Sequence, residues 1–373
     1  MIDNNIFKIN KKLNYLIEES LKNNVFTGCC IGFFFKKENI YSTVFNSYGY
    51  TDTDNVKTKV SEKTYFDLAS LTKPLVTTLV LLSLVAENKI GLDDNLGFLL
   101  GKKISGVKSK ITINNLLNHS SGLPPYKPYF EKLLLKQLSI RKEFIVSLIC
   151  KENLLFKPGD KTLYSDLGYI LLAYIAEHIS GEDLDIYWTR KIIKPLGLEK
   201  KLFYNKGNIR RPGSYVVTGE CCWTKNKLSG LVNDENCRSL GGVAGHAGLF
   251  GSANGLLILL MSFMQKLKDN SPLKPNIMRP MMEILNKGEK TDWILGFDRP
   301  TPGKSSSGKY FSKRTIGHLG FTGTSFWLDI ENEISVILLT NRVLFGEKMS
   351  GIKKLRPSVH NVIMEGLRLP PVC

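Results

Sequence analysis

The stretch Phe66-Asp67-Leu68-Ala69-Ser70-Leu71-Thr72-Lys73 decides the fold and the chemistry. A strand-like apolar segment precedes Ser70, and a helical pattern with Pro74 in its first turn runs from Leu71 to Asn88. Ser-x-x-Lys at a helix start places both side chains on one face, one turn apart. A nearby lysine can take the serine proton if burial or neighbours lower its pKa, and the serine N–H can point at a developing oxyanion. The stretch therefore predicts a nucleophilic serine with a lysine partner.

The tetrapeptide alone carries little information in this lysine-rich chain. It occurs six times, starting at Ser70, Ser105, Ser139, Ser271, Ser306 and Ser350. Of these, Ser70 is followed by a long apolar helix and preceded by a strand-like segment. Context therefore selects Ser70.

Strand patterns near both ends of the chain enclose a mainly helical stretch. We expect strands at 28–35, 40–44, 324–330 and 333–340, and helices at 6–23, 71–88, 112–118, 138–150, 166–180, 183–192 and 357–367. This order predicts an α+β fold with one antiparallel sheet built from both chain ends and flanked by helices, plus an inserted helical lobe. We expect residues 1–68 and 231–373 to form the lobe with the sheet and residues 69–230 the mainly helical lobe, with the active-site cleft between them.

The composition is that of a globular protein of 373 residues, with 51 Lys and Arg against 34 Asp and Glu and a net charge of +17. The basic residues are scattered and no nucleic-acid motif accompanies them, so a solvated surface is favoured over a nucleic-acid partner. The longest apolar runs are too short to span a bilayer. Seven cysteines without a Cys-x-x-Cys pair, and an N-terminus without a signal-peptide pattern, favour a reducing, cytoplasmic location.

Two further segments carry residues suited to a hydrolytic site. Tyr164 and Asp166 lie just before a helix, where Asp166 as an N-cap and Tyr164 as a buried ring are the simpler interpretations. His318 and Gly320 lead into the strand pattern at 324–330 and predict a strand edge that a substrate can approach. His246-Ala247-Gly248 has the same spacing but lies in a glycine-rich loop that runs into the helix after Ser252, which favours loop packing over a supporting role for His246.

Ser70-x-x-Lys73, Tyr164-x-Asp166 and His318-x-Gly320, in this order, resemble the serine β-lactamase and penicillin-binding-protein superfamily. The similarity is greatest to the class C β-lactamase-like branch, which also contains D-alanyl-D-alanine carboxypeptidases, D-aminopeptidases and esterases. Two supporting segments match that branch, at 116–124 and 240–250. The resemblance spans about residues 25–345.

The resemblance implies a β-lactamase/DD-peptidase-like fold and a role for each motif residue. Ser70 would accept the acyl group, Lys73 would be its first proton partner, and Tyr164 would relay a proton to the leaving group and later activate water. The backbone N–H groups of Ser70 and Phe321 would form the oxyanion hole, and the substrate would lie along the strand edge at 317–321. No metal or organic cofactor is implied.

Two departures from the branch redirect this expectation. Asp166 stands where the branch usually has asparagine, and a carboxylate there can pair with Lys73 and keep it protonated, which leaves more of the base role to Tyr164. His318 stands where β-lactamases and carboxypeptidases have lysine. A neutral imidazole supplies no fixed charge for a substrate carboxylate, so penicillins are less favoured than neutral esters or differently ended peptides.

The leading hypothesis is a serine hydrolase that forms an acyl-enzyme with an ester or a small amide or D-amino-acid peptide, with weak or no β-lactamase activity. The alternatives are a penicillin-recognising or scaffold protein that acylates without turnover, a true class C-like β-lactamase, and an unrelated α+β domain whose Ser-x-x-Lys matches are compositional. The expected partner is a small ester, peptide or β-lactam, with no nucleic acid and no membrane span. We expect a cytoplasmic protein, or a periplasmic one if a leader is missing from this sequence.

Overall fold

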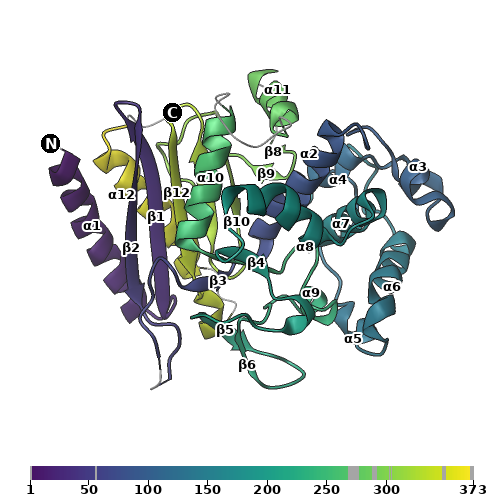
Figure 1. Cartoon of the computed structure of the whole chain (residues 1–373), viewed down its shortest axis with the longest axis horizontal. Helices are drawn as coiled ribbons and strands as arrows, with labels where there is room; N and C mark the ends of the chain where they lie inside the picture. Colours follow the sequence, from purple (N-terminus) through teal and green to yellow (C-terminus); the bar gives the residue numbers. More distant parts are fainter. Residues whose placement is uncertain are drawn as a thin grey trace.

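The computed structural model describes residues 2–54, 57–267, 277–287, 292–301, 303, 305–346 and 350–369. These residues form one large antiparallel sheet with helices on both faces, and a mainly helical region beside it (Figure 1).

Strands from both ends of the chain form the large sheet. Its seven strands lie in the order β2-β1-β12-β11-β10-β9-β8, and each neighbouring pair is antiparallel. They are β1 (Gly28–Lys37), β2 (Ile40–Gly49), β8 (Trp293–Ile294), β9 (Phe297–Asp298), β10 (Thr315–Leu319), β11 (Ser325–Asp329) and β12 (Ile334–Thr340). Because β1 pairs directly with β12, the sheet joins the two ends of the chain, which confirms the predicted α+β fold.

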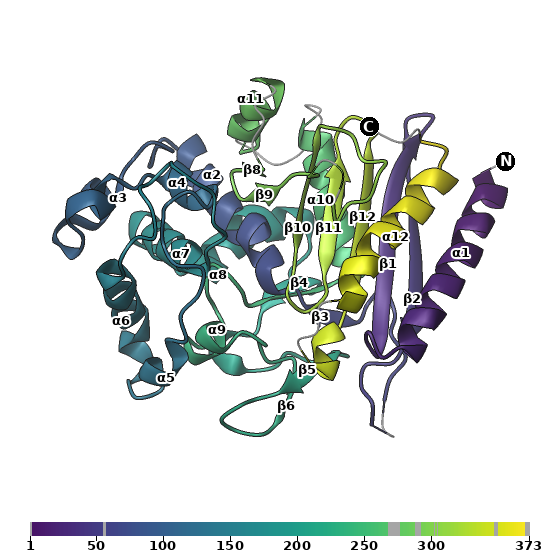
Figure 2. The ribbon, with the colours of Figure 1, turned by 180° about the vertical axis from the view of Figure 1, so that it is seen from behind.

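The two faces of this sheet belong to different hydrophobic clusters. Alternate residues of a strand point to opposite faces, and accordingly Phe33 and Phe35 pack in one cluster while Phe34 packs in the other. The helices α1 (Ile2–Lys22) and α12 (Ser350–Gly366) cover the first face (Figure 2). The helix α10 (Ala253–Leu267) covers the second face, toward the helical region.

The closing helix is longer than predicted. The sequence pattern predicted a start at Pro357, but α12 starts at Ser350 and Pro357 lies inside it. Ile352 and Leu355 are buried in the same cluster as Val359 and Ile363, so packing against the sheet continues the helix past the proline.

The helical region lies mostly in the middle of the chain. Its helices are α2 (Leu79–Ala86), α3 (Leu96–Leu100), α4 (Ile113–Leu117), α5 (Phe130–Leu133), α6 (Leu138–Lys151), α7 (Asp166–Ser180), α8 (Leu184–Trp188) and α9 (Glu235–Ser239), and α11 (Arg279–Lys287) follows later in the chain. The helix predicted over 71–88 is present as one continuous helical stretch, Ala69–Ala86, which begins with the short 3-10 helix η1 (Ala69–Leu71) and the π-helical η2 (Lys73–Thr78) before α2. Such π-helical turns occur frequently at functional sites.

The strand-like segment predicted before Ser70 forms the short strand β3 (Tyr65–Asp67), but the other short strands near the nucleophile were missed by the sequence analysis. β3 (Tyr65–Asp67), β7 (Leu249–Ser252) and β4 (Leu202–Tyr204) form a sheet with β7 in the middle, and β5 (Val217–Glu220) pairs with β6 (Lys227–Ser229). Three or four residues are too few to show a periodicity. The loop after His246 therefore enters β7 before α10 begins, and since β7 is central, His246 does not precede a strand edge.

Residues 69–230 contain β4, β5 and β6 besides their helices, and the division of the chain into two lobes stays a prediction.

Among the described residues, the one helical stretch long and apolar enough to cross a membrane, Ala69–Ala86, is 83% buried inside the protein. The six described cysteines are free thiols, and Cys373 lies outside the described residues.

Candidate active site

Ser70 lies in a strained turn that directly follows β3. Ala69 has a φ of +47°, a conformation that is uncommon for a residue with a side chain. The side chain of Asp67 accepts a hydrogen bond from the Ala69 N–H at 2.8 Å, which holds the turn in this shape. Strain of this kind occurs where the surrounding structure fixes it, often at active sites.

Lys73 is fully buried and surrounded by acceptors. Its Nζ donates to Ser70 Oγ at 3.0 Å and to the carbonyl oxygen of His246 at 3.1 Å, and lies 2.7 Å from Asp166 Oδ1. Burial alone would lower the pKa of Lys73, but Asp166 and Tyr164 outweigh burial and raise it. Two hydrogen-bond acceptors and the carboxylate of Asp166 therefore stabilise the ammonium form.

Asp166 does not cap α7, contrary to the simpler interpretation of the sequence. Ser165 occupies the N-cap position and accepts a hydrogen bond from the Gly168 N–H at 3.4 Å. Asp166 is the first residue of the helix, which leaves its carboxylate to pair with Lys73.

Tyr164 lies against the ammonium group of Lys73. Lys73 Nζ is 4.7 Å from the centre of the Tyr164 ring, and the Tyr164 hydroxyl hydrogen-bonds with Lys73 and Ser70. Burial raises the pKa of Tyr164, and the opposing effect of Lys73 does not cancel this rise. Tyr164 is therefore a neutral phenol next to the nucleophile.

Two residues that the sequence analysis gave no role hold the Tyr164 ring. The centre of the His119 ring is 4.5 Å from that of Tyr164, and Trp293 packs against both rings. His119 Nδ1 accepts a hydrogen bond from the Ser165 N–H at 3.1 Å. His119 belongs to the supporting segment at 116–124, but Trp293 had no recognisable signal because it stands in a strand of two residues.

His318 is near the end of β10, and its ring lies beside the rings of Tyr164 and Trp293. Its Nδ1 lies 2.8 Å from the carbonyl oxygen of Leu319 and must donate the proton, since a carbonyl oxygen only accepts. Its Nε2 is then a lone-pair acceptor, buried without a hydrogen-bond partner among the described residues. Burial and the nearby Lys73 lower the pKa of His318 to about 3, so the imidazole is neutral near pH 7.

Gly320 allows β10 to come close to the nucleophile turn. A Cβ at Gly320 would lie 2.0 Å from Thr324 Oγ1 and 2.9 Å from the carbonyl oxygen of Leu68. Pairing of β10 with β9 is at Gly317, which leaves the edge from His318 onward open within the described part of the chain. The Phe321 N–H has no hydrogen-bond partner among the described residues, which fits its predicted oxyanion role.

His246 contributes to the site mainly through its backbone. Its carbonyl oxygen accepts the hydrogen bond from Lys73, while its Nε2 lies 2.9 Å from Asp234 Oδ1. The same Asp234 oxygen accepts from the Cys237 N–H and caps α9. The position of Asp234 in this network was not found from the sequence.

These residues meet at a cleft of about 850 Å³. Of the predicted residues, Ser70, Tyr164, Asp166, His318, Gly320 and Phe321 line it. Lys73 and His246 lie directly behind this lining, in contact with Ser70 and Lys73 respectively. The structure thus brings all eight residues together, and their individual roles stay predictions.

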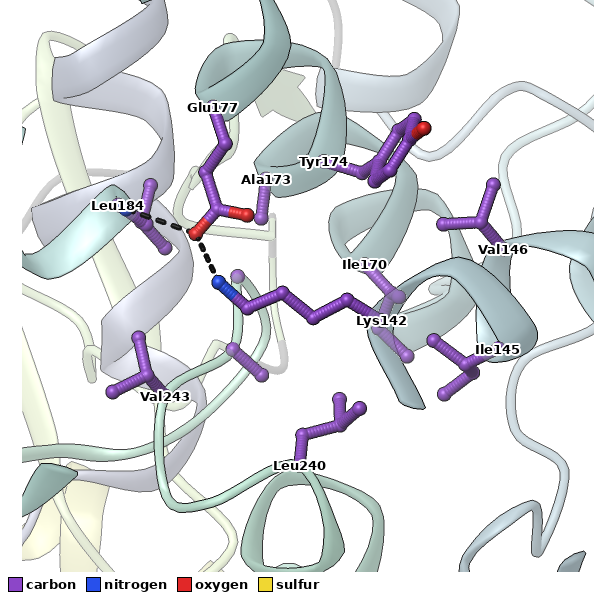
Figure 3. Close-up of a pocket in the computed structure, with 12 residues that line it drawn as sticks. Lys142, Ile145, Val146, Ile170, Ala173, Tyr174, Glu177, Leu184, Leu240 and Val243 are labelled. Carbon is purple, nitrogen blue, oxygen red and sulfur yellow. Dashed lines mark hydrogen bonds and ion pairs between the residues drawn. The ribbon is translucent and has the colours of Figure 1, made fainter. Parts of the chain in front are cut away.

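A second cavity, of about 30 Å³, lies between α6, α7 and the loop at 240–245 (Figure 3). Figure 3 shows Lys142 Nζ pointing at Glu177 Oε1, which is 2.6 Å away and also accepts from the Leu184 N–H. The remaining lining is mostly apolar. This space suits no more than a water molecule, so the cleft at Ser70 is the candidate site.

No group of three or more His, Cys, Asp or Glu side chains suited to a metal ion occurs among the described residues. The chemistry of the cleft is therefore considered from its hydroxyl, amine, carboxylate and imidazole groups.

Comparison with known proteins gives consistent matches. The family model described as Beta-lactamase matches residues 41–356. A protein of Salmonella typhi, provisionally named a D-alanyl-D-alanine carboxypeptidase, is 32% identical over 312 residues, covering 76% of this chain and 71% of the relative.

Solved structures show the same fold at low sequence identity. A class C beta-lactamase superposes with a TM-score of 0.71 and 16% identity, over 96% of this chain and 98% of the other. EstCE1, described as a hydrolase with promiscuous acyltransferase activity, superposes with a TM-score of 0.69 and 19% identity, over 96% and 98% of the two chains.

Proposed function

Because the chain belongs to the beta-lactamase family, whose members include serine hydrolases, we propose that it hydrolyses an ester or a small amide or D-amino-acid peptide through an acyl-enzyme on Ser70. The hydrogen bond from Lys73 Nζ to Ser70 Oγ, at 3.0 Å in a buried ion pair with Asp166, carries this proposal. An ammonium at that distance stabilises negative charge as it develops on the serine oxygen.

Tyr164 relays the proton in the proposed mechanism. Lys73 is held as an ammonium and is not free to accept the Ser70 proton. The Tyr164 hydroxyl can take the proton from Ser70 Oγ while giving its own proton to the leaving group, so that it ends as a neutral phenol again. The high pKa of Tyr164 supports this exchange over a standing phenolate.

Deacylation uses the same groups in reverse. A water molecule in the place of the leaving group gives a proton to Tyr164 Oη and attacks the acyl carbon, and Tyr164 returns its proton to Ser70 Oγ. The N–H groups of Ser70 and Phe321 would bind the oxyanion in both steps.

The electrostatics around His318 support a neutral substrate. Its imidazole offers an acceptor where a carboxylate-binding site needs a cation. Arg356 also lines the cleft, but its Nη2 donates to the carbonyl oxygens of Gly320 and Thr324 at 2.8 and 2.9 Å. We therefore propose esters and peptides without a carboxylate next to the scissile bond over penicillins.

Intact-mass spectrometry after incubation with a fluorophosphonate tests the proposal directly. The wild type should gain one adduct, and Ser70→Ala should gain none. Ser139→Ala is the matched control, because Ser139 starts another Ser-x-x-Lys tetrapeptide but is exposed on α6. Turnover of p-nitrophenyl acetate and of nitrocefin, read in parallel, should show an esterase preference.

The alternatives give different results in the same assay. An adduct on Ser70 that persists for hours without turnover would indicate a penicillin-recognising or scaffold protein. Faster turnover of nitrocefin than of the ester would indicate a class C-like β-lactamase. No adduct and no turnover would overturn the hydrolase proposal.

The cellular location belongs to the proposal as well. The free thiols of the six described cysteines favour a reducing compartment, which leads us to propose a cytoplasmic substrate. Fractionation of cells that express the full-length protein would test this.

A further inference from the structure

Asp67 is a buried carboxylate that joins two segments of the cleft wall. Its side chain is 2% exposed. Oδ1 accepts from the Ala69 N–H at 2.8 Å, and Oδ2 accepts from the Asn233 N–H at 2.7 Å. Ala69 and Asn233 both line the cleft, so a single carboxylate holds the nucleophile turn against the loop opposite.

The backbone around Asp67 is anchored from the sheet side too. Thr322 Oγ1 donates to the carbonyl oxygen of Asp67 at 2.8 Å, and Thr324 Oγ1 donates to that of Leu68 at 3.2 Å. The Leu68 carbonyl and the Ala69 N–H belong to one planar peptide group, so Thr324 holds this group from its carbonyl side and Asp67 holds it from its N–H side. The Asp67 side chain is the partner of the Ala69 N–H at the start of the strained turn.

We propose that Asp67 is a positioning residue, whose ionised carboxylate sets the Ser70 turn and the Asn233 loop in their reactive arrangement and whose protonation releases one of them. This inference rests on the hydrolase function proposed above. It assigns Asp67 no contact with substrate and no step of proton transfer.

The two hydrogen bonds explain why the ionised form is required. A carboxylate accepts on both oxygens, but a protonated carboxyl group carries a hydrogen on one of them. The oxygen that carries the hydrogen keeps only part of its acceptor capacity, and the group loses its negative charge. Protonation therefore weakens the bond to Ala69 or the bond to Asn233 and loosens the segment on that side.

The charges around Asp67 place this protonation close to neutral pH. Burial raises the pKa of Asp67 to about 6, and the negative charge of Asp234 contributes to this rise. The two N–H donors and the positive charge of Arg238 act in the opposite direction and lower the pKa. The Cys237 thiol also faces Asp67, and its own pKa is raised by burial and by the two carboxylates. Asp234 in turn pairs with His246.

A role in stability alone does not account for Asp67. Its pKa in the folded protein lies above the ordinary value of 3.8, so folding favours the protonated form. The ionised carboxylate consequently lowers the free energy of unfolding at pH 7, and this cost disappears as the pH falls below the folded pKa. The structure keeps the ionised group despite this cost.

The experiment compares the pH dependence of ester hydrolysis in the wild type and in Asp67→Asn. An asparagine keeps one acceptor and turns an NH₂ group toward the second N–H. We expect kcat to fall at least tenfold with KM within twofold, and the fall in wild-type kcat below about pH 6 to be absent from the variant. The melting temperature should not fall in proportion to the loss of kcat, because the variant removes a buried charge that lowers the free energy of unfolding.

Two further variants make the comparison specific. Asp52→Asn is the matched control, because Asp52 is also a buried carboxylate but pairs with Lys227 away from the cleft. This variant should keep the fall in kcat below about pH 6, which is the acid limb of the pH profile. Asp298 lines the cleft, and burial raises its pKa to about 7. Loss of the acid limb in Asp298→Asn instead of Asp67→Asn would overturn the proposal.

One of the remaining outcomes is decided without Asp67→Asn. A wild type whose kcat stays level from pH 7.5 to pH 5 would overturn the proposed protonation even if the variant failed to fold. Unchanged kcat in a folded Asp67→Asn would overturn the positioning role while the Ser70 adduct still formed. Failure of the hydrolase proposal differs from both, since no adduct would then form in the wild type.

Discussion

The two His-x-Gly segments of this chain have the same spacing and different surroundings. His246 and His318 are each 1% exposed, and both lie next to the catalytic network. His246 has a ring nitrogen paired with Asp234 and a carbonyl oxygen that accepts from Lys73. His318 donates from Nδ1 to the carbonyl oxygen of its neighbour, and its Nε2 is buried without a hydrogen-bond partner among the described residues.

The difference follows from the backbone on which each segment stands. His246 precedes β7, the central strand of its sheet, so its loop is enclosed and its polar groups are used internally. His318 lies where β10 continues beyond its pairing with β9, so its ring can reach a ligand. The His246 carbonyl oxygen bonds to Lys73 behind the cleft, and the His318 ring is part of the cleft wall. Equal spacing in sequence thus does not imply equal function.

Replacing Lys73 should have the largest effect, because both histidine segments meet at this residue. In Lys73→Ala the His246 carbonyl loses its donor, the partly exposed carboxylate of Asp166 loses its ion pair in the cleft, and Ser70 loses its cation. We expect acylation by a fluorophosphonate to slow by about 10³-fold, within the range for lost general acid–base and electrostatic groups. Stopped-flow or quenched mass spectrometry would measure this rate.

The control for Lys73→Ala is Lys142→Ala. Lys142 also pairs with a carboxylate on α7, Glu177, but at the second cavity. It should acylate at the wild-type rate. An equal loss in both variants would mean that the effect comes from the stability of α7 and not from the site.

Replacing His318 should change how the free energy of unfolding depends on pH. Its pKa in the folded protein is lowered to about 3, below the ordinary 6.5, so the unfolded chain binds the proton more tightly. The neutral ring therefore contributes stability that is complete above pH 6.5 and is lost as the pH falls toward 3. In His318→Gln, the slope of the unfolding free energy between pH 6 and 4 should flatten by about 1.4 kcal/mol per pH unit.

Urea unfolding at several pH values would measure this slope. His119 and His360 also have lowered pKa values because of burial, so part of the slope should remain in His318→Gln. An unchanged slope would show that His318 is already protonated in the folded protein, and would contradict a neutral ring in the cleft.

The sequence predicted the strands that bury both faces much better than the turn that carries Ser70. The strand patterns at 324–330 and 333–340 agree with β11 and β12 because alternating branched and aromatic residues have one stable arrangement there. The helical stretch predicted from residue 71 is present, but it begins as a 3-10 helix and a π-helix, which the apolar pattern does not distinguish from an α-helix. Ala69 at positive φ is held by the side chain of Asp67, two residues earlier, and the sequence analysis did not use this short-range bond.

Within the site, the motifs found the residues but not their connections. The pairing of Asp166 with Lys73 was predicted from the carboxylate that stands where the resembling branch usually has asparagine, and the structure shows it at 2.7 Å. Asp234 and Trp293 were not found, because their partners lie in other segments of the chain. Asp67 was given no role, although one of its two partners, Ala69, is only two residues away and the other, Asn233, is distant. Long-range contacts of this kind become visible only when the fold brings the loops together.

A smaller effect is expected on substrate preference when His318 is made cationic. His318→Lys should place a fixed positive charge at the open edge of β10, where a substrate carboxylate would lie. We expect the ratio of nitrocefin to p-nitrophenyl acetate turnover to rise about tenfold, since a partly exposed charge pair is worth about 1–2 kcal/mol. His318→Gln, which stays neutral, should leave the ratio near the wild-type value.

A ratio that rises equally in both His318 variants would contradict the electrostatic explanation. The cause would then be the size of the ring, which packs at 5.5 Å from Trp293 and 6.0 Å from Tyr164. The two variants therefore separate charge from shape at the same position.

Replacing the ring of His246 should have the smallest effect on activity. His246→Gln keeps the backbone carbonyl that accepts from Lys73 and loses only the contact with Asp234, whose bond to the Cys237 N–H remains. We expect kcat to fall about threefold and the free energy of unfolding to fall by about 1–2 kcal/mol, as for a lost buried hydrogen bond to a charged group. Steady-state kinetics and urea unfolding would measure the two changes. A loss of activity as large as that of Lys73→Ala, in a variant that stays folded, would mean that the His246 ring itself takes part in the reaction, and the two His-x-Gly segments would then be equivalent in function as well as in spacing.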